Sequence, residues 1–271
     1  MSIKKTIKKG ISFFIPKGIL KEEIKLKFYN LFSPKFVKFE IVKENTLKII
    51  YKTIYNDLCF FTEQALYSIV PDFDYYQFFY KVKENDVIID GGANVGILSM
   101  LFMKKTKAKG YVYCFEPDRL NINMMKSNFV LNKDLYKNYD IIDSLMWSKN
   151  ELIDFQESGT VASSALWFSD DIDIVKKQAI SLDEWSEDMK LEKIDFIKMD
   201  IEGAELEAIK GCKEIIEKFQ PNFAIASYHM VNGELTYIKL EEFFKEINYP
   251  FVTKKFRGNE IITFAGPAVL I

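Results

Sequence analysis

Short apolar segments that alternate with helix-length segments constrain the fold of this 271-residue chain more than any other feature. The first, Asp86-Val-Ile-Ile-Asp90, is a continuous apolar run of the kind found in strands buried on both faces. Residues 97–105 then place apolar side chains at helical spacing, and Tyr111-Val-Tyr-Cys-Phe115 indicates a second buried strand. This alternation predicts a mostly parallel, doubly wound α/β sheet with right-handed crossovers.

The same alternation continues to the end of the chain. Strands are expected at 139–145, 152–155, 194–199 and 223–226, and helices at 121–131, 206–219 (interrupted at Gly211) and 235–247. Segments 251–256 and 260–264 predict a closing antiparallel pair around a tight turn. We therefore expect one α/β domain at 81–271 behind an N-terminal extension at 1–80.

The extension is expected to be less regular, with short helices and then a hairpin around 39–55, whose turn is Glu44-Asn45, followed by an aromatic cluster at 73–80. We favour a helix that packs this cluster over the sheet edge, although one or two of its rings lining a substrate site is the alternative. Residues 1–40 carry ten Lys against three Glu, a local net charge of +7. This segment either packs on the domain by its apolar side, which we favour, or contacts a membrane surface or a partner.

Composition excludes several classes of protein. The chain is 48% hydrophobic, which is enough for a sizeable core, and its net charge of −2 gives no field that favours nucleic acid. The apolar run 11–15 is too short for a signal peptide, and no run reaches the ~18 residues of a transmembrane helix. Three scattered cysteines and one histidine favour a reduced cytoplasm and argue against structural zinc.

The sharpest local motif is Asp90-Gly-Gly-Ala-Asn-Val-Gly96, between the first buried strand and its helix. Its glycines, Gly91, Gly92 and Gly96, allow the backbone to approach a ligand closely, at the sheet edge where doubly wound folds bind ligands. A dinucleotide site would place glycine where Asn94 stands. The acidic, polar loop suits a ligand with a cationic amino acid end better than it suits a pyrophosphate.

Glu116 ends the second buried strand and is followed by Pro117. A carboxylate there can accept hydrogen bonds from both hydroxyls of a ribose. The alternative is structural, with Glu116 capping the next helix and Pro117 in its first turn. Together with the glycine loop, this position favours an adenosine-containing ligand.

A second polar cluster follows a later strand, at Ile194-Asp-Phe-Ile-Lys-Met-Asp-Ile-Glu-Gly-Ala-Glu205. Helix capping explains part of this cluster, because acidic groups favour helix N-termini. It does not explain Lys198, which lies within an apolar strand and needs a carboxylate partner there. Asp200 and Glu202 come where the strand ends, and we expect them in the reaction site.

Taken together, these motifs resemble the FkbM family of methyltransferases over about residues 84–230. The matching segments are Asp90–Gly96, Phe115-Glu-Pro117, Ser163-Ser164, Ser181-Leu-Asp183 and Asp195–Glu205. The resemblance implies a class I Rossmann-like methyltransferase fold, S-adenosylmethionine as methyl donor, and transfer usually to a hydroxyl oxygen. One departure lies after the strand expected at 223–226. Members of the family often have a carboxylate there, and this chain has Ala226-Ser-Tyr-His229.

Two models of the reaction site follow. In the first, which we favour, Asp200 or His229 is the general base and Lys198 fixes the carboxylates. In the second, Asp200, Glu202 and His229 hold Mg²⁺ or Mn²⁺, and the cation binds the acceptor oxygen. The acidic cluster and the resemblance together suggest a sugar hydroxyl or another small-molecule or glycan acceptor, with surface-polysaccharide precursors first.

Two other functions fit part of the pattern. A nicotinamide oxidoreductase would use the same fold, but Asn94 replaces the central glycine of its fingerprint. A non-catalytic adenosylmethionine-binding or scaffold protein would keep Asp90 and Glu116. It would not need the polar cluster at 198–205, so the sequence favours an enzyme.

Overall fold

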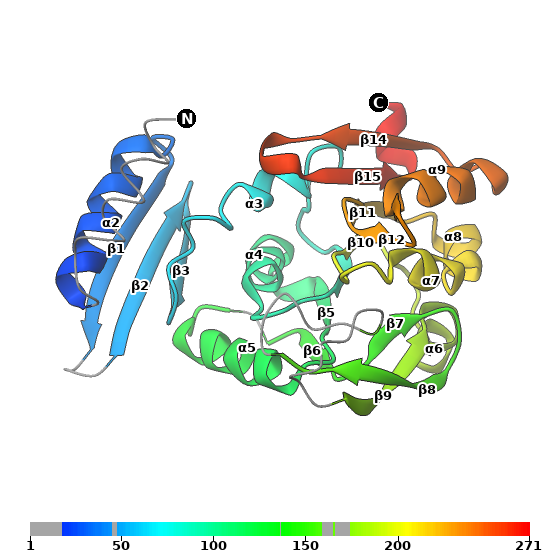
Figure 1. Cartoon of the computed structure of the whole chain (residues 1–271), viewed down its shortest axis with the longest axis horizontal. Helices are drawn as coiled ribbons and strands as arrows, with labels where there is room; N and C mark the ends of the chain where they lie inside the picture. The colour runs from blue at the N-terminus through cyan, green and yellow to red at the C-terminus, as the bar shows by residue number, and fades with distance from the viewer. Residues whose placement is uncertain (1–17, 45–47, 136, 159–164, 166–173) are drawn as a thin grey trace. The chain divides into compact units, whose positions relative to one another are not determined.

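A computed structural model describes residues 18–44, 48–135, 137–158, 165 and 174–271 (Figure 1). The chain divides into two compact units, Met1–Val70 and Pro71–Ile271. Each is treated by itself below, and the expected domain division at 80/81 stays a prediction. Within the described residues, no helix combines the length and the apolar character needed to span a membrane.

The first unit is a helix with a three-stranded antiparallel sheet. Helix α2 (Ile19–Phe32) is followed by β1 (Val37–Glu44), β2 (Lys48–Tyr55) and β3 (Leu58–Thr62), in the spatial order β1-β2-β3. The side chain of Asn30 ties the helix to the sheet by bonding both the N–H and the C=O of Phe39 at 2.8 Å. The hairpin expected from sequence is present as β1 and β2, and α2 precedes it where short helices were expected, whereas β3 was not expected. Asn45 of its expected turn lies outside the described residues.

A seven-stranded sheet in the order β14-β15-β11-β10-β4-β5-β6 forms the centre of the second unit. Its strands are β4 (Val87–Gly91), β5 (Tyr111–Phe115), β6 (Tyr139–Ile142), β10 (Phe196–Met199), β11 (Asn222–Ala226), β14 (Phe251–Lys255) and β15 (Ile261–Ala265). Neighbours from β6 to β11 pair in parallel, and β15 is antiparallel to both β11 and β14. The predicted doubly wound α/β fold with a C-terminal antiparallel strand is confirmed.

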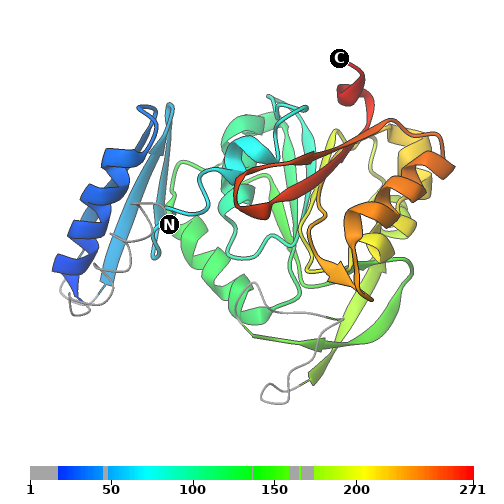
Figure 2. The same cartoon turned by 45° about the horizontal axis from the view of Figure 1, so that its top comes forward.

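Helices cover both faces of this sheet (Figures 1 and 2). They are α3 (Asp72–Tyr75), α4 (Ile97–Thr106), α5 (Arg119–Leu131), α6 (Leu182–Asp188), α7 (Glu205–Lys210), α8 (Lys213–Phe219) and α9 (Thr236–Glu246). Successive residues of a strand serve opposite faces. Ile197 therefore joins a core with Ile209 and Leu240, while its neighbour Phe196 packs edge-on against Phe102 of α4. This burial on both faces explains why the central strands are continuous apolar runs.

A second, three-stranded sheet was only partly anticipated. The segment expected as one strand at 139–145 turns after Ile142, and its end becomes β7 (Leu145–Trp147) in this sheet. There β7 lies beside β9 (Ile174–Ser181), which was not expected, and β9 pairs with β8 (Glu151–Gln156). Ser163-Ser164 lies outside the described residues.

The helical break expected at Gly211 has its cause in this second sheet. A Cβ at Gly211 would lie 2.3 Å from the carbonyl oxygen of Trp147 in β7. The backbones approach so closely that only glycine fits, and the helix divides into α7 and α8 at that contact. The aromatic segment 73–80 is helical only at α3, with Tyr76 at its C-cap.

We expect Asp118→Ala to lower the free energy of unfolding by about 1 kcal/mol. Asp118 is the N-cap of α5, where its carboxylate accepts hydrogen bonds from the N–H groups of Leu120 at 2.7 Å and Asn121 at 3.2 Å. Chemical denaturation of the purified protein measures the change. Asp188→Ala, at an exposed position near the end of α6, is the control and should change the stability little.

Candidate active site

The site lies where the chain reverses its direction of travel across the sheet. From β4 the chain builds β5 and β6 on one side, and then returns to place β10 and β11 on the other side of β4. The loops that follow β4 and β10 therefore diverge above a crevice at the carboxyl ends of the strands. The glycine motif follows β4, and the acidic motif follows β10, so the topology brings the two sequence motifs together.

The glycine loop is shaped by contact with the loop after β10. Gly92 has φ +67°, and a Cβ there would lie 1.9 Å from the carbonyl oxygen of Asp200. Gly96 has φ +80° and is the N-cap of α4, and Asn94 also adopts a positive φ, of 51°. The side chain of Asn94 accepts a hydrogen bond from the N–H of Val95 at 2.7 Å, so the residue that replaces a glycine stabilises its own turn.

Lys198 is buried, as expected, but its partner is Asp90. The Nζ atom of Lys198 lies 3.1 Å from Oδ1 of Asp90, and their side chains are 3% and 0% exposed. Nζ also donates to the carbonyl oxygens of Gly91 at 2.9 Å and Gly92 at 2.8 Å. Ser99 donates to the other oxygen of Asp90 at 2.6 Å. Lys198 thus fixes the glycine loop, and not the carboxylates of Asp200 and Glu202 as the sequence suggested.

Glu116 points into the same loop from the end of β5. Its Oε2 accepts a hydrogen bond from the N–H of Asn94 at 2.7 Å, and its Oε1 accepts from the N–H of Asp118 at 2.9 Å. The side-chain amide of Asn121 lies 3.3 Å from Oε1. Burial raises the pKa of Glu116 to about 7, although these hydrogen bonds act to lower it. Asp118, and not Glu116, caps the helix that follows.

A single pocket joins the two motifs, with about 560 Å³ of open space between its walls. Gly92, Asn94, Glu116 and Pro117 line it from the cofactor side expected from sequence. The loop after β10 lines it from the other side, with Asp200 and Glu202 among others. Its apolar walls are Phe115, Leu145, Met146 and Phe155, a mixed lining typical of small-molecule sites.

Two tyrosines hold Asp200. Tyr76 belongs to the aromatic cluster in which rings lining a substrate site were the alternative, and Tyr228 was given no role by sequence analysis. The hydroxyl of Tyr76, beside α3, donates to Oδ2 of Asp200 at 2.8 Å. The hydroxyl of Tyr228, after β11, lies 3.4 Å from Oδ1. The side chain of Asp200 is 26% exposed, so it stays accessible while its orientation is fixed.

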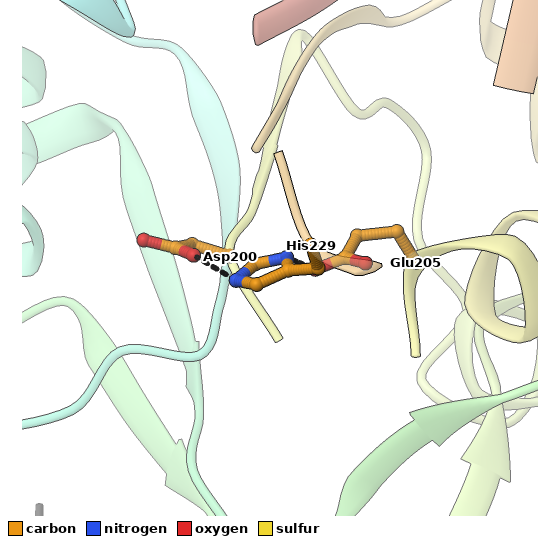
Figure 3. A group of neighbouring side chains, drawn as sticks. All are labelled: Asp200, Glu205 and His229. Carbon is orange, nitrogen blue, oxygen red and sulfur yellow. Dashed lines mark ion pairs between the residues drawn. The ribbon is translucent and has the colours of Figure 1, made fainter. Parts of the chain in front are cut away.

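His229 lies between carboxylates (Figure 3). Its Nδ1 is 2.9 Å from Oε1 of Glu205, while its Nε2 is 3.4 Å from Oε2 of Glu202 and 3.8 Å from Oδ1 of Asp200. Burial acts to lower the pKa of His229, but Glu202, Glu205 and Asp200 outweigh it and raise the pKa to about 10. The ring is therefore an imidazolium at neutral pH.

Glu205 contacts both His229 and the backbone of the turn that carries Glu202. Its side chain is fully buried, and its Oε1 accepts hydrogen bonds from the N–H groups of Ile201 at 3.1 Å and Gly203 at 3.2 Å. It therefore closes the turn that carries Glu202, which itself has a positive φ of 54°. Sequence analysis placed Glu205 in the motif without giving it a role.

The cluster also resembles part of a cation site. Ligand atoms of Asp200, Glu205 and His229 all lie within 4.8 Å of one another, whereas the expected set was Asp200, Glu202 and His229. In Figure 3, however, the ring lies between Asp200 and Glu205 and turns a different nitrogen toward each. An imidazolium has no lone pair for a metal, so binding a cation here requires His229 to lose its proton first.

Comparisons with known proteins agree with these motifs. A family model described as Methyltransferase FkbM domain matches residues 90–252. The chain is 26% identical to methyltransferase sdnD of Sordaria araneosa over 214 residues, which cover 65% of this chain and 76% of that protein. It is 30% identical to the 2-O-methyltransferase NoeI of Sinorhizobium fredii (strain NBRC 101917 / NGR234) over 162 residues, which cover 50% of this chain and 61% of that protein.

Among solved structures, the chain is similar to the methyltransferase FkbM from Methylobacillus flagellatus KT. The TM-score is 0.49 at 20% identity, and the match covers 68% of this chain and 44% of that one. The chain thus spans less than two thirds of the length of both NoeI and this structure.

The charge of His229 is directly measurable because it is the only histidine in the sequence. With a pKa of about 10, its ring should remain protonated from pH 6 to pH 8 and give an unchanged NMR signal in that range. Glu205→Gln removes one of the charges that raise the pKa, and should move the titration toward the ordinary value of about 6.5. Because folding raises the pKa of His229, protonation of its ring stabilises the folded protein. That stabilisation is complete below the ordinary pKa of about 6.5 and is lost as the pH rises through about 10.

Glu207→Gln is the matched control, since Glu207 lies in the same helix but pairs with Lys210. It should leave the His229 signal as in the wild type. A wild-type signal that titrates near pH 6.5 would show that His229 is neutral at physiological pH and would restore it as a candidate base.

Proposed function

The chain belongs to the FkbM family of methyltransferases, and from this premise we propose that it transfers a methyl group from S-adenosylmethionine to a hydroxyl oxygen of a sugar or similar acceptor. The observation that carries the proposal is the single pocket, lined by the glycine loop and Glu116 on one side and by Asp200 and Glu202 on the other. Residues of the first side would hold the methyl donor, and the acidic turn would face it across the pocket.

Several residues fit the proposed cofactor. The Glu116 carboxylate has acceptor capacity for ribose hydroxyls beyond the backbone bonds that orient it. The apolar side chains of Leu145 and Phe155 offer contact to a flat ring. Gly92 has no side chain, so its backbone is directly accessible at the pocket wall. Asn94 in place of a central glycine favours this ligand over a nicotinamide dinucleotide.

When bound, the cofactor supplies a methyl group on a positively charged sulfur. Transfer of that group to the acceptor oxygen would break the carbon–sulfur bond and leave its electron pair on sulfur. The hydroxyl proton must leave the acceptor oxygen, and we assign Asp200 as the base that takes it. Tyr76 and Tyr228 orient its carboxylate, so the acceptor meets a fixed base.

His229 has another role in this proposal. As an imidazolium it cannot accept the proton, but its positive charge balances Asp200, Glu202 and Glu205. Lys198 likewise acts through the glycine loop and is a positioning residue. The second candidate is a divalent cation bound beside Asp200, which the cluster of ligand atoms favours and the charge of His229 opposes.

The acceptor is proposed from the site and from one relative. A base at the pocket mouth suits a weakly acidic hydroxyl, and the relative NoeI is described as a 2-O-methyltransferase. We place a sugar hydroxyl first, within a glycan or a surface-polysaccharide precursor, and propose the cytoplasm as the location. The chain has three cysteines that lie far apart in the sequence, a number and spacing that agree with a reducing compartment.

Adenosylhomocysteine should bind more tightly at pH 8 than at pH 6, by up to about tenfold. Glu116 has a raised pKa of about 7, and ribose hydroxyls require the ionised, accepting carboxylate. Calorimetry across this range measures the effect, and NAD should show no binding. Glu116→Gln should bind more weakly at pH 8, by about 1–3 kcal/mol, and lose the pH dependence.

A matched control is Glu157→Gln, because Glu157 lies outside the pocket lining and pairs with Lys177. It should retain the pH dependence of the wild type. Tight NAD binding without an adenosylhomocysteine signal would overturn the proposed cofactor.

Asp200→Asn should lower turnover by about a factor of 10² or more and leave adenosylhomocysteine affinity nearly unchanged. The substitution keeps the shape of the side chain and removes its ability to take a proton. Methyl transfer from labelled adenosylmethionine to a panel of sugars measures turnover. The same assay with a chelator separates the two candidates, because only a cation-dependent enzyme loses activity and regains it with Mg²⁺ or Mn²⁺. Near-wild-type turnover in Asp200→Asn would remove Asp200 from the chemistry.

A further inference from the structure

Helix α2 of the first unit has an inner side that contacts the rest of that unit and an outer side that does not. The helix packs on one face of the three-stranded sheet, chiefly along β1 (Figure 1). On its inner side, the ring of Tyr29 stacks on that of Tyr67 at 4.0 Å. Glu22 also lies on this side, where it accepts a hydrogen bond from the hydroxyl of Tyr51 at 3.1 Å. The outer side of the helix is therefore the one left for another partner.

The outer side of α2 carries an apolar stripe. The residues that recur there at helical spacing are Leu20, Ile24, Lys27 and Leu31. Leu20 is 62% exposed and Leu31 is 77% exposed. Phe32, at the end of the helix, and Phe36, just beyond it, are exposed as well. A single exposed apolar residue needs no explanation, but a group of them along one helix indicates a surface that binds a partner or a membrane.

The charge of this stripe is positive. It contains the exposed Lys27 and no acidic residue. Glu22 is turned to the inner side, and Glu40 lies in β1 between the ammonium groups of Lys38 at 2.6 Å and Lys52 at 3.0 Å. The net charge of +7 in residues 1–40 is thus combined with an apolar helix face that has no negative charge of its own.

We propose that α2 binds an anionic lipid surface, lying in the plane of that surface with its apolar stripe at the boundary of headgroups and acyl chains. Helices that bind in this way combine aliphatic and aromatic residues with lysines, whose ammonium groups are attracted to anionic lipids. Sequence analysis left membrane contact open as the alternative for this segment. The proposal goes beyond the proposed function, because it depends neither on methyl transfer nor on the acceptor.

Charge favours lipid over the other occupants that an apolar face can take. A second copy of this chain, docked through the same stripe, would bring two segments of net charge +7 together, and like-charge repulsion opposes that contact. Residues 1–17 of the same chain contain five lysines and no acidic residue, so their charge has the same sign as that of Lys27. An anionic bilayer supplies both an apolar interior and the opposite charge.

Cosedimentation of the full-length protein with lipid vesicles tests the proposal. At about 0.1 M salt, the protein should pellet with vesicles made of phosphatidylcholine and phosphatidylglycerol. Vesicles of phosphatidylcholine alone should bind it at least about tenfold more weakly. The bound protein should be released at about 1 M salt, where the Debye length falls from about 10 Å to about 3 Å.

Two variants separate the apolar and the charged parts of the contact. The double variant Leu20→Ser with Leu31→Ser removes exposed apolar surface and should weaken binding to the anionic vesicles about tenfold or more. Lys27→Gln removes one positive charge and should weaken that binding about fivefold. Thermal unfolding of both variants should match the wild type, because no residue of α2 is buried.

Leu152→Ser and Lys213→Gln are the matched controls. Leu152, in β8, is 63% exposed, which is close to the exposure of Leu20, and Lys213 is an exposed lysine at the start of α8. Both variants should bind the anionic vesicles as the wild type does.

Several outcomes would overturn the proposal. They are absence of vesicle binding, equal binding to neutral and anionic vesicles, and wild-type binding by the double variant. A dimer in analytical ultracentrifugation that the double variant dissociates would assign the stripe to a second copy of the chain. Vesicle binding that appears only after deletion of residues 1–17 would assign it to those residues. None of these measurements uses methyl transfer, so a failure of the proposed function leaves them unchanged.

Discussion

The buried pair of Lys198 and Asp90 joins β10 to β4, the two neighbouring strands between which the order of strands in the sheet reverses. The residues face each other in the register of β10 and β4, and both side chains are almost fully excluded from solvent. Removing one member of such a pair leaves an uncompensated buried charge, which typically costs about 3–5 kcal/mol. Here the ammonium also holds the carbonyl oxygens of Gly91 and Gly92. The conformation of the glycine loop, and through it the cofactor wall of the pocket, therefore depends on one charge inside the sheet.

The acidic side of the pocket follows from this arrangement. Gly92 lies against the backbone of Asp200, so the loop fixed by Lys198 also sets the position of the proposed base. Negative charge accumulates there, and Asp72 shows the consequence: burial first, and then Glu260 and Asp200, raise its pKa to about 7. His229 is the imidazolium that offsets this charge on the other side of Asp200. A neutral histidine would leave neighbouring carboxylates in a partly buried site without compensation, so the charge of His229 and the acidity of the turn are mutually dependent.

Sequence analysis predicted the parts of the site whose residues form a recognisable pattern over a few neighbouring positions. The β4 strand, its glycine loop and Glu116 carry apolar runs, special backbone conformations and a polar residue at a strand end, all visible over a few positions. Tyr76 and Tyr228 carry no such local signal, because each becomes a partner of Asp200 only through folding, 124 and 28 positions away. The partner of Lys198 was missed for the same reason: the carboxylates close to it in sequence are at 195, 200 and 202, but strand pairing brings Asp90 alongside.

The cofactor side of the pocket and its acceptor side depend on different kinds of interaction. This difference explains how a chain of this family can combine a fixed cofactor site with its own acceptor. The cofactor side is built from backbone and buried charge, where Gly92 and Lys198 leave little room for change. The proposed acceptor side is built from side chains next to short elements, with Tyr76 beside α3 and Tyr228 after β11. Changes in those elements alter the shape and hydrogen bonding offered to an acceptor without disturbing the central sheet. We therefore expect acceptor choice to be set by the segments between the motifs, where sequence resemblance alone carries the least information.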